Sequence, residues 1–190
     1  GALIIPKSMI TLKNIALNKS RIAFIDVLKK MGGKIKVRKT KTISGEDVGN
    51  IQVSYSLLNA IEVKASSSPY LIDEYPILSI AASQAKGVTV MRGLSELRHK
   101  ESDRIKSITT NLSKIGFKVI SKKDDISIKG SNKIKIINQK KIKTYGDHRI
   151  AMSFVILSLL YKNKLIIDDV SCISISYPDF EKHLKKLSAH

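Results

Sequence analysis

The chain has 190 residues, 43% of them hydrophobic, which is enough for one substantial core or at most two small ones. Its only cysteine, Cys172, excludes an internal disulfide and a four-cysteine zinc site, and the four scattered histidines show no metal-binding spacing. No apolar run approaches the roughly 20 residues of a membrane span, and the first residues lack a signal peptide, so we expect a reducing, cytoplasmic setting without membrane association.

The charge is strongly basic, with 34 Lys and Arg against 16 Asp and Glu and a formal net charge of +18. Such a balance suggests a nucleic-acid partner. However, the lysines are spread along the chain, and only 5% of the residues are aromatic, so we interpret the charge as compositional and expect no nucleic acid to bind. The charge would also attract a small anionic substrate, and a non-catalytic basic module that binds a polyanion is an alternative.

Apolar residues recur with the period of strands in some segments and with the period of helices in others. Strands are predicted at residues 10–17, 34–40, 50–56, 60–65, 88–94 and 164–170, with a turn at 44–47 and a hairpin at 118–130. Helices are predicted at residues 20–31, 75–86, 101–115, 147–161 and 178–187. No linker rich in Pro, Gly or Ser divides these elements, so the pattern predicts one mixed α+β domain over residues 1–190.

Two types of helix repeat along the chain. The sequence from Arg21, RIAFIDVLKKMGGKIKV, aligns with RIKSITTNLSKIGFKVI from Arg104, and both contain an amphipathic helix, a glycine turn and a strand. The sequence from Asp73, DEYPILSIAASQAKGVTV, resembles DHRIAMSFVILSLLYKNKLII from Asp147, and both helices are apolar nearly all round. A helix without a polar face is buried on every side, so we expect helices inside the domain and sheets outside.

The segment LRHKESDRI places Lys100 and Arg104 near a predicted helix start, where unpaired N–H groups disfavour cations. In the helix predicted from Glu101, this glutamate projects onto the middle of a buried isoleucine and leucine stripe. Partial desolvation favours the protonated form of such a carboxylate and predicts a general acid. An ordinary i, i+3 ion pair between Glu101 and Arg104 is the structural alternative.

A second helix start with cations follows in TYGDHRIAMSF. Asp147 is a suitable N-cap, and His148 and Arg149 then occupy the first positions of an almost entirely apolar helix. Two helix starts that each carry an arginine are destabilised unless an anion lies between or near them. Helix N-termini and arginine side chains together make a good phosphate or carboxylate site, so we favour an anion site at which Arg104 and Arg149 converge.

The segment LIDEYPIL has two interpretations. Asp73 and Glu74 before Pro76 fit an N-cap and an acidic first turn. Alternatively, Asp73 acts as a base or accepts a hydrogen bond from a hydroxyl, because its helix belongs to the same buried class as the helix with Arg149. The periodicity does not decide between them.

The segments DEYPIL, GLSELRHKESDRI, DHRIAMSF and SYPDF, in this order and at this spacing, resemble the C-terminal half of the 5-enolpyruvylshikimate-3-phosphate synthase family. The resemblance covers essentially the whole chain, and the pair LR-x-KESDR and DHR-x-AM is highly specific. It implies mixed βαβαββ units, repeated about three times, with buried helices. It also implies that residues 1–190 form the C-terminal domain of a two-domain enzyme. The N-terminal domain, its partner in the active site, is then absent from this chain, and this fragment alone is nearly inactive.

The resemblance further implies a 3-phosphoshikimate 1-carboxyvinyltransferase, which transfers the enolpyruvyl group of phosphoenolpyruvate to the 5-hydroxyl of shikimate 3-phosphate and releases phosphate. No metal or organic cofactor is implied. An enzyme like the UDP-sugar enolpyruvyltransferases, which share the fold, is the alternative within this class.

By motif match, the resemblance assigns the catalytic roles to two carboxylates. Asp73 would bind and deprotonate the shikimate hydroxyl, and Glu101 would deliver a proton to the methylene carbon of phosphoenolpyruvate and later remove one. Four cations would bind the substrates, namely Lys100 beside the hydroxyl, and Arg104, Arg149 and His148 at the carboxylate. Two positions depart from the family pattern: Ile175 stands where some members carry a phosphate-binding lysine, and Glu96 where some carry Asn.

Overall fold

The N-terminal part of the molecule is a three-stranded antiparallel sheet with the strand order β1-β3-β2. The computed structural model describes residues 1–131, 134 and 136–188. The turn between β2 and β3 consists of Ser44 and Gly45, whose φ angles of 48° and 81° suit a two-residue hairpin turn. The bounds are β1 (Met9–Ala16), α1 (Lys19–Lys30), β2 (Lys34–Ile43) and β3 (Glu46–Ser54).

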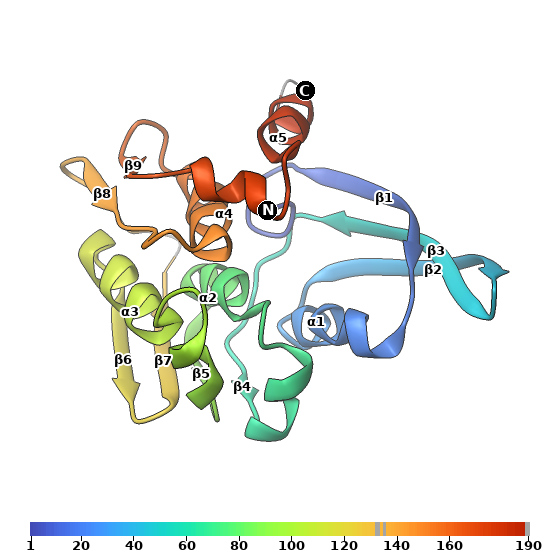
Figure 1. Cartoon of the computed structure of the whole chain (residues 1–190), viewed down its shortest axis with the longest axis horizontal. Helices are drawn as coiled ribbons and strands as arrows, with labels where there is room; N and C mark the ends of the chain where they lie inside the picture. The colour runs from blue at the N-terminus through green and yellow to red at the C-terminus, as the bar shows by residue number, and fades with distance from the viewer. Residues whose placement is uncertain (132–133, 135, 189–190) are drawn as a thin grey trace.

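The middle of the chain forms a complete βαβαββ unit. Its strands make a sheet in the order β4-β5-β7-β6, in which β4 runs parallel to β5 and the other pairs are antiparallel. The helices α2 and α3 pack on this sheet (Figure 1). The bounds are β4 (Glu62–Val63), the 3-10 helix η1 (Ala65–Tyr70), α2 (Tyr75–Gln84), β5 (Gly87–Met91), the 3-10 helix η2 (Ser95–His99), α3 (Arg104–Ile115), β6 (Lys118–Lys122) and β7 (Asp125–Gly130).

The C-terminal part contains two short parallel strands, β8 and β9, that are connected through α4. The helix α4 packs against α2 in the interior and against the 3-10 helix η3. The bounds are β8 (Lys140–Ile142), α4 (His148–Ser158), β9 (Leu165–Ile167), η3 (Ser171–Ile175) and α5 (Phe180–Ser188).

The α+β class and the repeated units expected from the sequence are confirmed. The middle unit has the full βαβαββ order, whereas the first unit has βαββ and the third has βαβα within the described residues. Eight of the ten residues of α2 are buried, and α2 and α4 pack against each other, as their apolar sequences predict. The outer strand β2 is mostly exposed, so the helices lie inside and the sheets outside.

Several boundaries differ from the sequence prediction. The helix predicted from Glu101 begins at Arg104, because the Asp103 side chain caps it by accepting a hydrogen bond from the backbone N–H of Lys106 at 3.0 Å. The strand predicted at 60–65 is limited to two residues, and η1 follows it. The strand β8 and the 3-10 helices have no counterpart among the predicted elements, because segments this short show too little periodicity.

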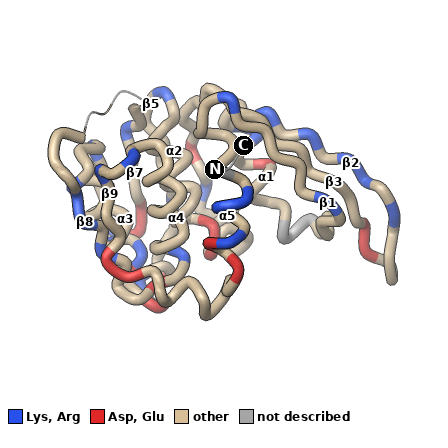
Figure 2. Tube along the Cα trace, turned by 90° about the horizontal axis from the view of Figure 1, so that it is seen from above, with Lys and Arg blue, Asp and Glu red and all other residues tan. Residues whose placement is uncertain are grey.

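The basic residues are not confined to one part of the fold (Figure 2). Lys and Arg are distributed over most elements, including the exposed edge strand β2 (Figure 2). This distribution agrees with the interpretation of the charge as compositional. Within the part of the chain that the structure describes, no helix combines the length and the apolar content needed to cross a bilayer.

Candidate functional site

The start of α4 is fixed by the protein's own contacts. Asp147 caps the helix, as the sequence predicts, because its Oδ1 accepts hydrogen bonds from the backbone N–H groups of Arg149 at 2.9 Å and Ile150 at 3.3 Å. The preceding loop is held by Thr144, whose N–H and hydroxyl donate to Oδ1 of Asp168 at 2.9 and 3.0 Å. These hydrogen bonds therefore fix the position of the first residues of α4.

A buried amide connects α3 to the same loop. The side chain of Asn111 donates from Nδ2 to the carbonyl oxygen of Lys143 at 2.8 Å, and its Oδ1 accepts from the N–H of Lys143 at 3.0 Å. Asn111 is 1% exposed, so water does not compete for these two bonds. The amide thus pairs with the loop as a neighbouring strand would, and it fixes α3 relative to the residues that lead to α4.

Arg104, the first residue of α3, is paired with three carboxylates although its side chain is only 1% exposed. Its Nε donates to Oδ2 of Asp147 at 2.8 Å, and its Nη2 lies 3.4 Å from Oδ1 of the same residue. Its Nη1 donates to Oδ1 of Asp73 at 3.1 Å, and its Nη2 donates to Oε2 of Glu101 at 2.7 Å. The anions that face this cation are therefore side chains of the protein itself.

Burial and ion pairing shift the pKa of Asp147 in opposite directions. The side chain of this residue is 0% exposed. Burial raises the pKa of its carboxyl group. The charge and hydrogen bonds of Arg104, the N–H of Arg149 and the hydroxyl of Ser102 lower this pKa by more, so it lies below its usual range. For Arg104, burial lowers the pKa, but the carboxylates raise it above its usual value. Both side chains of this pair are therefore charged at neutral pH.

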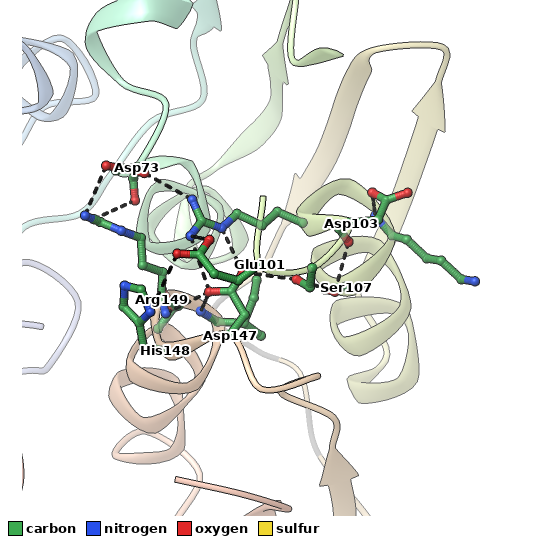
Figure 3. Close-up of polar contacts among 12 residues, drawn as sticks. Asp73, Glu101, Asp103, Ser107, Asp147, His148 and Arg149 are labelled. Atoms are coloured by element: carbon green, nitrogen blue, oxygen red, sulfur yellow. Dashed lines mark hydrogen bonds and ion pairs between the residues drawn. The ribbon is translucent and has the colours of Figure 1, made fainter. Parts of the chain in front are cut away.

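Asp73 connects the two arginines that the sequence predicts to converge. Its Oδ1 accepts from Nη1 of Arg104 and its Oδ2 from Nη2 of Arg149, each at 3.1 Å, and its carbonyl oxygen accepts from Nη1 of Arg149 at 3.1 Å. The N-cap of α2 is Glu74, so the interpretation of Asp73 as an N-cap is wrong. The carboxylate of Asp73 lies between the two guanidinium groups (Figure 3).

Glu101 lies in the loop between η2 and α3, and its side chain points toward those of Asp147, His148 and Arg149 (Figure 3). Its side chain is 47% exposed, so the prediction of a desolvated carboxylate on the apolar face of a helix is wrong. The i, i+3 ion pair with Arg104, which the sequence offers as the structural alternative, is present at 2.7 Å. The second carboxylate oxygen lies 3.9 Å from Nδ1 of His148, the first residue of α4.

The structure brings most of the predicted site residues together. Five of them meet in one network: Asp73, Glu101, Arg104, His148 and Arg149. Lys100 follows η2 directly before Glu101, and no carboxylate among the described residues lies within ion-pair distance of its ammonium group.

Two further residues belong to the network. The sequence predicts Asp147 only as an N-cap, and the structure adds its pairing with Arg104. The hydroxyl of Ser102 donates to Oδ2 of Asp147 at 3.0 Å and so attaches the loop with Glu101 to the start of α4. The position of Arg104 beside a buried stripe indicates that it needs a carboxylate partner, but the sequence does not identify Asp147 as that partner.

The network contains three carboxylates and two guanidinium groups, so its cations are already paired. Asp73, Glu101 and Arg149 are 42%, 47% and 33% exposed, whereas Arg104 and Asp147 are almost fully enclosed. An anionic ligand can therefore reach Arg149 from solvent, whereas Arg104 lies behind the half-exposed carboxylates of Asp73 and Glu101. Within the described ranges, no group of three or more His, Cys, Asp and Glu side chains is placed to hold a metal ion.

Comparison with known proteins agrees with the motifs. Residues 1–184 match the family model of EPSP synthase (3-phosphoshikimate 1-carboxyvinyltransferase). The chain is 42% identical over 187 residues to a 3-phosphoshikimate 1-carboxyvinyltransferase of Petrotoga mobilis. The aligned residues cover 98% of this chain and 43% of that protein. It is also 42% identical over 190 residues to a protein of the same name from a Sulfurihydrogenibium species, which covers 99% of this chain and 43% of that protein.

A solved structure shows the same fold. The EPSP synthase from Acinetobacter baumannii superimposes with a TM-score of 0.87 at 32% sequence identity, over 98% of this chain and 43% of that one. The chain thus spans less than half the length of the curated relatives it matches. These matches confirm the resemblance indicated by the four sequence segments, and they do not favour the UDP-sugar enzyme or the polyanion-binding module.

Proposed function

Because residues 1–184 match its model, the chain belongs to the EPSP synthase family, and we propose that it carries one half of an active site for enolpyruvyl transfer. In the proposed reaction, the enolpyruvyl group of phosphoenolpyruvate moves to the 5-hydroxyl of shikimate 3-phosphate and phosphate is released. The observation that carries this proposal is the convergence of Arg104 and Arg149 on a single carboxylate, with Glu101 beside them.

In this proposal, Arg104 and Arg149 bind the carboxylate of phosphoenolpyruvate. Their spacing supports the assignment, because one carboxylate, that of Asp73, already accepts from both guanidinium groups at 3.1 Å. His148 lies at the start of α4 beside Arg149 and supports this end of the ligand. Lys100, whose ammonium group has no internal carboxylate partner among the described residues, is proposed to contact the acceptor substrate.

Two half-exposed carboxylates carry the proposed proton transfers. Glu101 donates a proton to the methylene carbon of phosphoenolpyruvate, while the 5-hydroxyl oxygen attacks the neighbouring carbon and Asp73 accepts the hydroxyl proton. Phosphate then leaves from that carbon and takes up the proton that Asp73 accepted, and Glu101 removes a proton from the new methyl group, so that the vinyl group forms again. The exposure of both side chains, 47% and 42%, supports these roles because each must reach a ligand.

The remaining part of the site has to come from elsewhere in a longer protein. We propose that residues 1–190 form the C-terminal domain of a two-domain cytoplasmic enzyme, since the chain spans 43% of its relatives. Two guanidinium groups facing three carboxylates leave too little positive charge to bind a phosphate ester tightly, so the N-terminal domain is proposed to supply further cations. The chain by itself is expected to be nearly inactive, because half a cleft neither positions the substrates nor excludes water.

Joining this chain to the N-terminal part of the Petrotoga mobilis relative tests the proposed activity. We expect release of phosphate that requires both phosphoenolpyruvate and shikimate 3-phosphate, and almost none from the chain alone. In the joined protein, Glu101→Gln should lower kcat by about 10²- to 10⁴-fold and leave KM nearly unchanged, because the amide cannot transfer a proton. A folded joined protein without phosphate release would contradict the proposal.

A matched control separates the loss of proton transfer from the loss of a charge. Glu181 on the exposed helix α5 likewise pairs with a cation, since its Oε1 lies 2.7 Å from Nζ of Lys185. Glu181→Gln should therefore keep the turnover of the unmodified protein. Turnover with a UDP-sugar instead of shikimate 3-phosphate would favour an enzyme like the UDP-sugar enolpyruvyltransferases. Strongly salt-dependent binding to any DNA duplex, unaffected by Glu101→Gln, would favour a non-catalytic polyanion-binding module.

A further inference from the structure

The two arginines of the candidate site already hold a carboxylate of the chain itself. We propose that Asp73 is the resident counter-ion of Arg104 and Arg149, which an incoming carboxylate ligand has to displace. This inference rests on the proposed function of the same site. It adds a second role to Asp73, as an internal competitor that sets the affinity of the arginines for external anions.

The geometry supports direct competition. Each carboxylate oxygen of Asp73 accepts from a different guanidinium group, Oδ1 from Arg104 and Oδ2 from Arg149, both at 3.1 Å (Figure 3). A ligand carboxylate that bridges the arginines needs the same two donors. Two carboxylates at this spacing also repel each other, so Asp73 and the ligand exclude each other from this position.

Asp73 can also leave the arginines at a smaller cost than Asp147. Asp147 is 0% exposed and holds the first turn of α4, so its release would unpair a buried cation and uncap a helix. Asp73 is 42% exposed, and its side chain caps no helix, because α2 begins at Tyr75 with Glu74 at the N-cap position. Its side chain can therefore move into solvent while α2 stays intact.

An internal competitor has a predictable effect on affinity. Because Asp73 is attached to the same fold, its effective concentration at the arginines exceeds that of a dissolved ligand, and the apparent affinity for an external carboxylate falls. A hydroxyl group that draws Asp73 away restores this affinity. The acceptor hydroxyl and the carboxylate ligand therefore favour each other's binding, and the coupling is equal in both directions.

Binding of a simple dicarboxylate to the 190-residue chain tests the competition. Isothermal titration should show that the Asp73→Asn variant binds malonate at least about tenfold more tightly than the unmodified chain does. A gain of this size lies within the usual range of coupling free energies in proteins. The amide keeps the shape of the side chain but removes its negative charge. The control is Asp124→Asn, which makes the same change in net charge at the β6–β7 turn, where Asp124 accepts from Nε of Arg98 at 3.2 Å, and which should leave the affinity unchanged.

A second variant locates the effect. Adding Arg149→Gln to Asp73→Asn should abolish the gain, since the bridging pair of donors is lost. Unchanged or weaker malonate binding by Asp73→Asn, or a gain that survives Arg149→Gln, would overturn the inference. The two proposals fail separately. If Asp73→Asn strengthens malonate binding to the chain but the joined protein with Asp73 releases no phosphate, the competition stands and the enolpyruvyl transfer is refuted.

Discussion

The starts of α2 and α4 show that equivalent aspartates in a repeated sequence can serve different purposes. Asp73 and Asp147 occupy matching places in the repeat, and the carboxylates of both pair with Arg104. Asp147 is 0% exposed and caps its helix, whereas Asp73 is 42% exposed and caps none. Asp147 thus stabilises the start of α4 and the buried arginine, whereas the half-exposed Asp73 has no capping role.

The cause lies in the residues that follow each aspartate. Asp147 is followed directly by the helix, so its side chain reaches the unpaired N–H groups of the first turn. After Asp73, the sequence Glu74-Tyr75-Pro76 moves the helix start by one residue and places a proline, which has no N–H group, in the first turn. Asp73 is thereby released from capping and can pair with Arg149.

The largest expected effect is a loss of stability on removing the buried carboxylate. Asp147→Ala should lower the free energy of unfolding by about 3–5 kcal/mol, because it leaves Arg104 without its buried partner and removes the cap of α4. Urea unfolding followed by circular dichroism measures this loss. A change below about 1 kcal/mol would mean that Arg104 finds sufficient pairing without Asp147.

A double-mutant cycle sharpens this result. Arg104→Met should cost markedly less stability in the Asp147→Ala background than in the unmodified chain, since the partner of the arginine is already absent. Additive losses would show that the two residues act separately.

A smaller, pH-dependent loss is expected from the same carboxylate. The pKa of Asp147 is lower in the folded than in the unfolded chain, so the unfolded chain takes up the proton first as the pH falls. The contribution of Asp147 is therefore fully present above the ordinary aspartate pKa of about 3.9 and is lost as the pH falls through its lower folded value. Unfolding measured from neutral to acidic pH should show a shallower acid dependence for Asp147→Asn, and an unchanged dependence would contradict the assignment.

The smallest expected effect belongs to the exposed aspartate. Asp73→Asn should change the free energy of unfolding by less than about 1 kcal/mol, because a half-exposed ion pair contributes little in water. The same urea experiment measures it beside Asp147→Ala. If both variants lost equal stability, the distinction between a structural and a displaceable carboxylate would be wrong.

Much of this arrangement was predictable from the sequence. The periodicities of α2 and α3 extend over several turns and identify which helix is apolar all round and which is amphipathic. The convergence of Arg104 and Arg149 followed from two helix starts that carry cations without an evident partner.

Other features could not be predicted, because they depend on how separate elements pack. The bonds between Asn111 and Lys143 and the pairing of Arg104 with Asp147 require the relative positions of α3 and α4, which no local pattern encodes. The sequence pattern places Glu101 in the helix, but Glu101 and Asp103 both precede it, and the cap is Asp103.

A crystal structure of the joined protein with phosphoenolpyruvate bound tests the central claim most directly. We predict that the ligand carboxylate accepts from Nη1 of Arg104 and Nη2 of Arg149, that Asp73 has moved away from both, and that the contact between Arg104 and Asp147 is unchanged. Phosphoenolpyruvate bound away from these arginines, or bound there with Asp73 still bridging them, would contradict the account.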